Sequence, residues 1–240
     1  MTLRLAMWSG PRNISTAMMR SWENRTDCEV IDEPFYACYL QATGIEHPMR
    51  NEVIASQSTD WDQVGDELLR SPAPIFYQKH MTQHMLPGKD LSWASHLRHC
   101  FLIRDPLEVV ASYSRKRTSP TTDDIGLIRQ LELYRELQES TGQAIPVIEA
   151  STVLLEPERM LTRLCNHFGI AFRSEMLSWP AGRRDSDGIW AEHWYQSVEK
   201  STGFEPYRAR DINLDVAARG VAEASRPAYD ALLASPTLIT

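Results

Sequence analysis

HCFLIRDPLEVVAS, residues 99–112, combines a short apolar run with the beginning of a helix. Cys100 to Ile103 are continuously apolar, which is typical of a central parallel strand that is buried on both faces. Asp105 is expected to cap the helix that follows, with Pro106 at the first helical position. Glu108 stands where the second residue of a capping box is found. The stretch therefore predicts a buried strand that leads directly into a helix.

Arg104 and Ser112 are the candidate binding residues of this stretch. Arg104 follows the strand, and open α/β sheets bind their ligands at the carboxyl ends of the strands. Ser112 lies about two turns along the predicted helix. A guanidinium and a hydroxyl that meet at this edge indicate a site for a phosphate-like anion, whereas the alternative is a structural arginine without a ligand.

A second candidate anion site lies near the N-terminus. Residues 3–8 are a short β-prone run, after which Gly10 and Pro11 turn the chain into a helix expected to begin near Ser15. Backbone N–H groups at a helix start bind anions, and Ser15 and Thr16 add hydroxyl donors. The Gly-x-x-x-x-Gly-Lys-Ser/Thr motif of magnesium-dependent kinases is missing, which favours a transfer reaction without a metal.

The rest of the chain alternates strands with helices, as a parallel sheet requires. We expect further strands at 28–33, 75–79 and 146–149, and helices at 57–70, 125–138, 158–168 and 216–233. This order predicts an α/β fold with three layers, α/β/α, around a central parallel sheet. A chain of 240 residues fits one domain, in which residues 172–200, rich in Pro, Gly, Trp and charge, form a lid.

Composition limits the possible partners. The net charge of −7 and the lack of a basic stripe argue against nucleic-acid binding and suit a local positive pocket for a small anion. The four cysteines have no Cys-x-x-Cys spacing and are expected to be reduced packing residues. No apolar run is long enough for a membrane span, and the first strand begins at Leu3 with no signal peptide before it. We therefore expect a cytoplasmic protein with a small-molecule substrate.

Three segments resemble, in the right order, those of sulfotransferases that use 3′-phosphoadenosine 5′-phosphosulfate (PAPS). Residues 11–16 are similar to the 5′-phosphosulfate loop, a P-loop-like turn, with Ile14 where that family commonly has glycine. The Arg104 segment is similar to the 3′-phosphate-binding segment. Residues 183–190, RRDSDGIW, are similar to the loop Arg-Lys-Gly-x-x-Gly-x-Trp, with Asp185 in place of its first glycine. The donor-binding residues that the resemblance implies are Arg12, Asn13, Ile14, Ser15, Thr16, Arg104, Ser112, Arg183, Arg184 and Trp190.

Residues 77–87 resemble the family segment that carries the catalytic base, Lys-Thr-His-Leu-Pro-x-x-Leu-Leu-Pro. The resemblance implies His80 as the base and Lys79 as the group that neutralises the bridging oxygen of the leaving nucleotide. His84 is a nearby histidine that the pattern does not select. Glu33 is the rival for the base, because it also lies at the carboxyl end of a predicted strand and some members use a glutamate. Glu33 could instead hold a cationic acceptor or cap a helix.

The resemblance implies a metal-free, PAPS-dependent sulfotransferase that acts on a hydroxyl or an amine of a small acceptor. Arg12, which would contact the sulfuryl group, is counted with the catalytic residues. Two alternatives remain open: a P-loop kinase for a small metabolite, and a non-catalytic module that binds a 3′-phosphonucleotide. Adenine would stack on Trp190, Trp194 or another ring.

Overall fold

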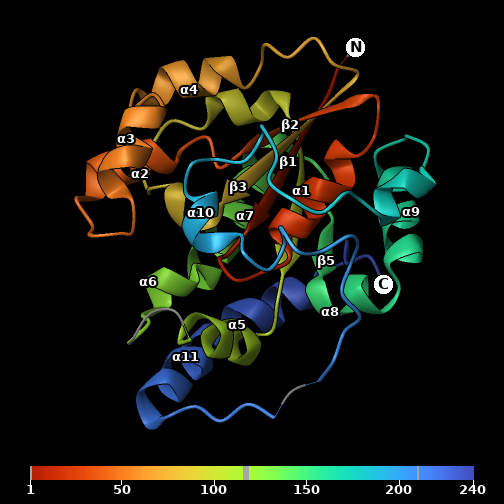
Figure 1. Cartoon of the computed structure of the whole chain (residues 1–240). Coiled ribbons are helices and arrows are strands. Elements are labelled where there is room, and N and C mark those ends of the chain that lie inside the picture. The colour runs from red at the N-terminus through yellow and green to blue at the C-terminus, as the bar shows by residue number, and fades with distance from the viewer. Residues whose placement is uncertain (1, 116–118, 210) are drawn as a thin grey trace.

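The structure of the protein is a computed structural model that describes residues 2–115, 119–209 and 211–240. Its centre is a parallel sheet of five strands in the order β2-β3-β1-β4-β5 (Figure 1). The strands are β1 (Leu3–Ser9), β2 (Cys28–Asp32), β3 (Ile75–Met81), β4 (Arg98–Ile103) and β5 (Val147–Glu149). The predicted parallel sheet is thus confirmed. Strand β3 is longer than expected, because His80 and Met81 continue the pairing with β1.

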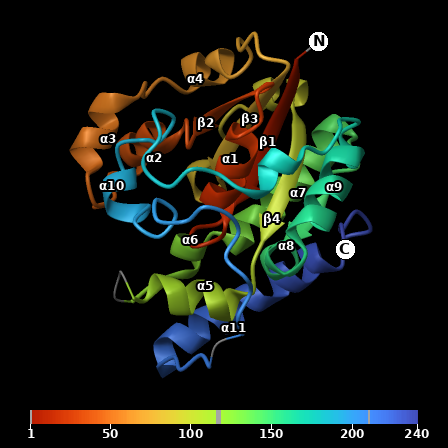
Figure 2. The same cartoon turned by 45° about the vertical axis from the view of Figure 1, so that its right-hand side comes forward.

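Helices cover both faces of the sheet, as the predicted three layers require (Figures 1 and 2). They are α1 (Ser15–Glu23), α2 (Tyr36–Thr43), α3 (Arg50–Ser56), α4 (Trp61–Glu67), α5 (Pro106–Tyr113), α6 (Thr122–Ile125), α7 (Leu127–Thr141), α8 (Ala150–Leu155), α9 (Pro157–His167), α10 (Ala191–Trp194) and α11 (Val216–Leu233). Three short 3₁₀ helices are η1 (Thr82–His84), η2 (Ser92–His96) and η3 (Ser174–Leu177). Helix α2 is the helix that Glu33 could have capped, but its N-cap residue is Phe35 and no side chain caps its first turn.

Alternation along the strands sorts the side chains into two cores. Leu5 and Met7 of β1 pack with apolar residues of α1, α8 and α9. Ala6 and Trp8 point to the other face and pack with residues of α4, α5, α7 and α11. Successive residues of any strand therefore enter different layers of the molecule. This rule decides which side chains of β3 can reach a ligand.

The junction from β4 to α5 follows the prediction in part. The Asp105 carboxylate accepts a hydrogen bond of 2.8 Å from the Leu107 N–H, and Pro106 is the first helical residue. Glu108 does not complete a capping box. Its carboxylate instead accepts a hydrogen bond of 2.9 Å from Arg104 Nε, because a charge-assisted bond to a guanidinium is stronger than a bond to a neutral amide. The glutamate therefore holds Arg104 at the strand end.

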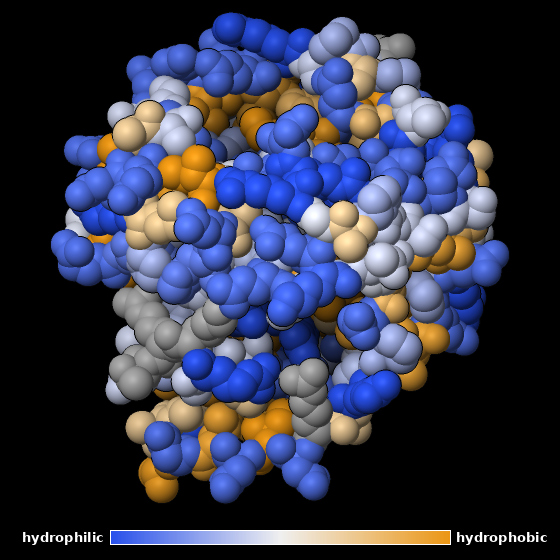
Figure 3. All heavy atoms as spheres, viewed as in Figure 1, coloured by the Kyte–Doolittle hydropathy of each residue, from blue (hydrophilic) through white to orange (hydrophobic). Residues whose placement is uncertain are grey.

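The region expected to be a lid is packed firmly onto α2. Trp190 and Tyr195 are buried there against Tyr36 of α2, and Figures 1 and 2 show α10 beside that helix. Gly188 makes the packing possible, since a Cβ at this position would lie 2.1 Å from the Trp190 ring. Within the described ranges, no helix is long and apolar enough to cross a membrane. The face of the molecule drawn in Figure 3 is mainly hydrophilic.

Candidate active site

A cavity of about 340 Å³ lies at the carboxyl edge of the sheet. It is lined by residues that end or follow β1, β2, β3 and β4, where the strand order predicts a ligand site. The predicted residues that line it are Arg12, Asn13, Ile14, Ser15, Thr16, Glu33, Lys79, Arg104 and Ser112. The cavity lining does not include His80, Arg183, Arg184 or Trp190. Most of the predicted site residues therefore line one cavity. His80 on β3 and the loop that carries Arg183, Arg184 and Trp190 lie outside it.

The loop after β1 is fixed to β4 and α5 through Arg12. Arg12 Nε donates a hydrogen bond of 3.1 Å to Ser112 Oγ, and Arg104 Nη1 donates one of 2.8 Å to the Arg12 carbonyl. Arg12 has a left-handed backbone with φ of 56°, while Ile14 has φ of −87°. The loop therefore turns at Arg12, so that position 14 needs no glycine. Strained backbone of this kind in a non-glycine residue concentrates at functional sites.

Asn13 has a structural task in the same loop. Its amide nitrogen donates to the Leu102 carbonyl at 3.0 Å, and its Oδ1 accepts from the Ile14 N–H at 2.9 Å. This leaves the first turn of α1, with Ser15 and Thr16, facing the cavity. The first N–H groups of a helix have no partner within the helix and carry positive potential. The loop is thus arranged to receive an anion.

Arginine side chains add positive charge to this end of the cavity. Burial lowers the pKa of Arg12, and the neighbouring guanidinium groups of Arg115 and Arg104 lower it further. Nearby like charges disfavour the charged form of each group. Arg104 pairs with Glu108 at 2.8 Å, which leaves a net positive cluster. A bound anion would relieve that repulsion.

A second cavity of about 660 Å³ adjoins the first and shares Arg104 with it. Arg115, Tyr207 and Arg208 line its outer part. Tyr207 donates a hydrogen bond of 2.7 Å to Glu108 Oε1, so that the segment before α11 is tied to the same glutamate as Arg104. The two cavities adjoin, and the second contains arginines together with the carboxylates of Glu108, Glu205 and Asp211.

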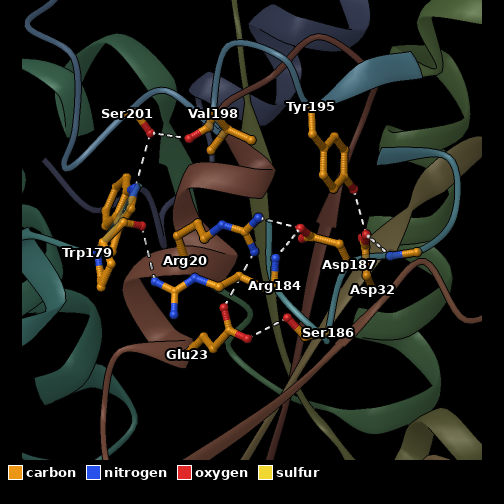
Figure 4. A network of polar contacts seen from close by, with 12 residues as sticks. Arg20, Glu23, Asp32, Trp179, Arg184, Ser186, Asp187, Tyr195, Val198 and Ser201 are labelled. Carbon is orange, nitrogen blue, oxygen red and sulfur yellow. Dashed lines mark hydrogen bonds and ion pairs between the residues drawn. The ribbon is translucent and has the colours of Figure 1, made fainter. Parts of the chain in front are cut away.

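The Arg183 and Arg184 pair lies away from both cavities. Arg183 is exposed, and the Arg184 side chain donates to the Pro180 carbonyl at 3.4 Å. Their loop is held against α1, because Asp187 forms an ion pair of 2.7 Å with Arg20 and both of these side chains are fully buried (Figure 4). Asp187 also accepts from the Arg184 N–H at 2.8 Å. The implied role of this pair in binding the donor phosphate is not supported by the geometry.

Trp190 is likewise outside the cavity. It is 2% exposed, and its indole N–H donates to the Tyr195 hydroxyl at 3.2 Å. A ring buried in this way has no free face for adenine. Trp194, the other ring considered from the sequence, does line the cavity.

Lys79 is the centre of a buried polar cluster. Its ammonium donates to Asp32 Oδ1 at 2.8 Å, to Glu33 Oε1, and to the Tyr195 hydroxyl at 2.9 Å. The Tyr195 hydroxyl donates in turn to Asp32 Oδ2 at 2.7 Å (Figure 4). Three acceptors use all three ammonium protons. Lys79 therefore has no proton free for a leaving nucleotide, and it positions Glu33 instead.

The cluster carries more negative than positive charge. Burial lowers the pKa of Lys79, but Asp32 and Glu33 together raise it well above its usual value. Burial raises the pKa of Glu33, the charge of Asp32 raises it further, and Lys79 lowers it only in part. One cation between two carboxylates leaves one of them with a high proton affinity. Glu33 is the carboxylate that lines the cavity, and its φ of 42° shows a strained backbone.

His80 is on the opposite face of the sheet from Lys79, since neighbouring residues of a strand point to opposite sides. It is 1% exposed, its ring stacks on Trp8 with a centroid separation of 4.3 Å, and its Nε2 lies 3.1 Å from Gln78 Oε1. Burial lowers its pKa to about 3. The geometry does not support the prediction of His80 as the base, because the ring is buried against Trp8 and does not line the cavity.

His84, which the sequence pattern did not select, does line the cavity. Its ring stacks on Tyr36 and Tyr39 with centroid separations of 4.6 and 4.9 Å. Its Nε2 lies 4.0 Å from Glu33 Oε2. Burial lowers the pKa of His84 well below its usual value, so that the ring is neutral at pH 7. A hydroxyl placed between these two atoms could contact both.

Asp32 and Tyr195 are the positioning residues that the sequence analysis missed. Asp32 could have been found, because it precedes Glu33 at a strand end and lies opposite Lys79 in the parallel register. Tyr195 had no local signal, since only the tertiary fold brings it to β2. Across the described residues, no group of three or more His, Cys, Asp or Glu is placed to hold a metal ion.

The burial of His80 predicts an acid-sensitive fold. Its pKa is about 3 in the folded protein, well below the ordinary value of 6.5, so that between these pH values only the unfolded chain binds the proton. Stability is therefore lost as the pH falls below 6.5, by up to about 1.4 kcal/mol per pH unit for this residue. The free energy of unfolding, measured with urea at pH 7 and at pH 5, should fall less between these two pH values in His80→Phe than in the wild type. Replacement of the exposed His96 by Gln should leave the loss unchanged, and an equal loss in all three proteins would contradict the prediction.

The sequence of this chain is similar to a known protein family and to two plant proteins. The family described as sulfotransferase domain matches residues 3–235. Two proteins of Arabidopsis thaliana named branched-chain-amino-acid aminotransferase-like protein 1 and 2 are 34% and 35% identical over 94% and 82% of this chain. The chain spans only 40% and 35% of the length of these relatives. Their names therefore describe larger proteins, of which this chain matches a part.

Solved structures show the same fold at low sequence identity. The sulfotransferase domain from the curacin biosynthetic pathway is 14% identical, with a TM-score of 0.56 over 93% of this chain and 97% of that domain. The sulfotransferase from Alicyclobacillus acidocaldarius is 10% identical, with a TM-score of 0.56 over 98% of this chain and 95% of that protein. The family match across nearly the whole sequence, together with this shared fold, shows that the chain belongs to the sulfotransferase domain family.

Proposed function

We propose that this protein transfers the sulfuryl group of PAPS to a hydroxyl or an amine of a small acceptor, with Glu33 as the base. The observation that carries the proposal is one cavity with Arg12 and the start of α1 at one end and Glu33 at the other. A transferase needs both an anion-binding donor site and a base for the acceptor within one enclosed space.

The donor end has the features that an anionic nucleotide requires. The 5′-phosphosulfate would lie against the first turn of α1 and Arg12, where N–H groups and a guanidinium converge. The 3′-phosphate would lie toward the second cavity, near Arg104, Arg115 and Arg208, which line it. This arrangement replaces the Arg183 and Arg184 pair, because those two side chains are absent from the lining of both cavities.

Glu33 is the better candidate for the base than either histidine. It faces the cavity, and burial raises its pKa toward the working pH, where a general base is most effective. His84 has a pKa well below its usual value, which makes it a weak base. The role that suits His84 is to orient the acceptor hydroxyl beside Glu33 Oε2.

The reaction is a displacement at sulfur. The acceptor oxygen forms a bond to the sulfur atom, and the bond from sulfur to the bridging oxygen of the 5′-phosphate breaks. The acceptor proton moves to Glu33, and 3′-phosphoadenosine 5′-phosphate leaves with the electron pair of the bridging oxygen. Arg12 and the α1 amides stabilise the charge that develops on that oxygen. Lys79 and Tyr195 keep the Glu33 carboxylate in place throughout.

The nucleotide site can be tested by calorimetry without any acceptor. 3′-Phosphoadenosine 5′-phosphate should bind more than about tenfold more tightly than 5′-AMP, because each charge-assisted contact to the 3′-phosphate contributes about 1.5–3 kcal/mol. Arg104→Ala should abolish most of this preference. Arg183→Ala, which removes an exposed arginine outside both cavities, is the matched control and should leave it intact. If Arg183→Ala lost the preference and Arg104→Ala kept it, the 3′-phosphate would bind at the Arg183 loop instead.

The base can be tested by kinetics. Glu33→Gln should lower kcat by about 10²- to 10⁴-fold while the affinity for 3′-phosphoadenosine 5′-phosphate stays within about threefold, because the carboxylate acts on the acceptor. His80→Phe should keep most of the activity. A silent Glu33→Gln beside an inactive His80→Phe that still binds the nucleotide would overturn the assignment.

The pH profile gives an independent test of the Lys79 cluster. Since Glu33 must be ionised to accept a proton, kcat/KM should fall as the pH falls through its pKa. The hydroxyl of Tyr195 lowers that pKa, so Tyr195→Phe should move the acidic limb of the profile to higher pH. An unchanged limb would show that Tyr195 has only a structural role.

A further inference from the structure

The two ends of the active-site cavity have opposite electrostatic character. The donor end contains Arg12 and Arg104. The other end is lined by Glu33 and by the rings of five residues, which we call the aromatic wall: Tyr36, Tyr39, His47, His84 and Trp194. The acceptor has to lie at this second end, because Glu33 is there.

The aromatic wall is an ordered group of rings. His84 stacks on Tyr36 at 4.6 Å and on Tyr39 at 4.9 Å, and the rings of His47 and Trp194 lie 5.6 Å apart. Tyr36 donates a hydrogen bond to His47 Nδ1 or accepts one from it, which ties the loop after α2 to that helix. Tyr36 and His84 are buried and support the wall, whereas Tyr39, His47 and Trp194 are only partly buried. The negative face of a π-system attracts a cation, so these three rings are the ones that can contact it. Because His84 is neutral at pH 7, it does not offset this attraction.

Charge at this end of the cavity is net negative. Lys79 is the only lysine or arginine among the described lining residues besides Arg12 and Arg104 of the donor end. Its ammonium is already shared between Asp32 and Glu33, which leaves the three groups with one negative charge when both carboxylates are ionised. Glu33, with 10% of its side chain exposed, presents that charge to the cavity. An anionic acceptor would be repelled here, whereas a cation would balance the charge.

We propose, on the basis of the function proposed above, that the acceptor is a compact alcohol bearing an ammonium group. Its hydroxyl lies between Glu33 Oε2 and His84 Nε2, which are 4.0 Å apart, and its ammonium group lies against the aromatic wall. The cavity of about 340 Å³ must also receive the phosphosulfate, which limits the acceptor to a few carbon atoms between these two groups. The proton balance of the transfer is unchanged, because the hydroxyl proton still moves to Glu33.

Two alcohols of the same shape test this proposal. Choline carries a trimethylammonium group, and 3,3-dimethyl-1-butanol has a neutral tert-butyl group in its place. With saturating PAPS and the wild-type protein, mass spectrometry of the sulfated products should give a kcat/KM about tenfold or more higher for choline, as expected for a desolvated cation on aromatic rings. An equal or higher value for the neutral alcohol would overturn the inference while leaving the proposed sulfuryl transfer intact.

Variants of Tyr39 test the aromatic wall itself. Tyr39 is only partly buried on α2, so its replacement should not unfold the protein. Tyr39→Leu removes the ring and should lower the choline preference by about 3- to 30-fold, while Tyr39→Phe keeps the ring and should retain it. The neutral alcohol is the reference in each variant, so that the quantity compared is the ratio of the two kcat/KM values and not either value alone. An equal choline preference in Tyr39→Leu and the wild type would count against the wall as the cation site.

A binding measurement separates this inference from the proposed function. Calorimetry with tetramethylammonium, in the presence of 3′-phosphoadenosine 5′-phosphate, requires no turnover. Binding to the wild type that weakens in Tyr39→Leu, together with no sulfation of either alcohol or of any acceptor in a panel of small alcohols and amines, would support the cation site and contradict the sulfotransferase proposal. Absence of both binding and sulfation would overturn both proposals.

Discussion

The ammonium group of Lys79, buried between Asp32 and Glu33, is the interaction on which the site depends. It joins the end of β2, the carboxyl end of β3 and, through Tyr195, the segment that follows α10. Loss of one partner from such a buried group costs about 3–5 kcal/mol, because it leaves a charge without compensation. The same contacts hold Glu33 in a strained backbone conformation at the cavity. Stability and the geometry of the proposed base are therefore set by one lysine.

A second constraint is the division of charge along the cavity. Arg12 and Glu33 lie in loops that leave neighbouring parts of the sheet edge, and both have left-handed backbones. The left-handed turns give one loop a guanidinium beside the α1 amides and the other a carboxylate beside the aromatic rings. A displacement at sulfur needs this separation, since negative charge develops on the leaving oxygen while a proton is released at the acceptor.

Sequence patterns predicted the parallel sheet and placed the loop of residues 11–16, Arg104 and Ser112 at one edge of it, because these predictions rest on local periodicity and on the rule that ligands bind at carboxyl strand ends. They did not anticipate the burial of His80, whose ring stacks on Trp8 because alternation along β3 turns it to the face opposite Lys79. They also did not anticipate the position of the Arg183 loop, because an ion pair between Arg20 and Asp187, distant in sequence, holds it away from the cavity. Contacts of this kind have no local signature.

The most direct test of the account is sulfuryl transfer itself. The wild-type protein should be incubated with PAPS, a panel of small hydroxyl and amine acceptors, and EDTA, and both products should be quantified by mass spectrometry. The proposed transfer should give equal amounts of 3′-phosphoadenosine 5′-phosphate and sulfated acceptor without added magnesium, since the loop after β1 lacks the Lys-Ser/Thr pair of magnesium-dependent kinases. Phosphate transfer from ATP that requires magnesium, with no sulfated product from PAPS, would contradict it.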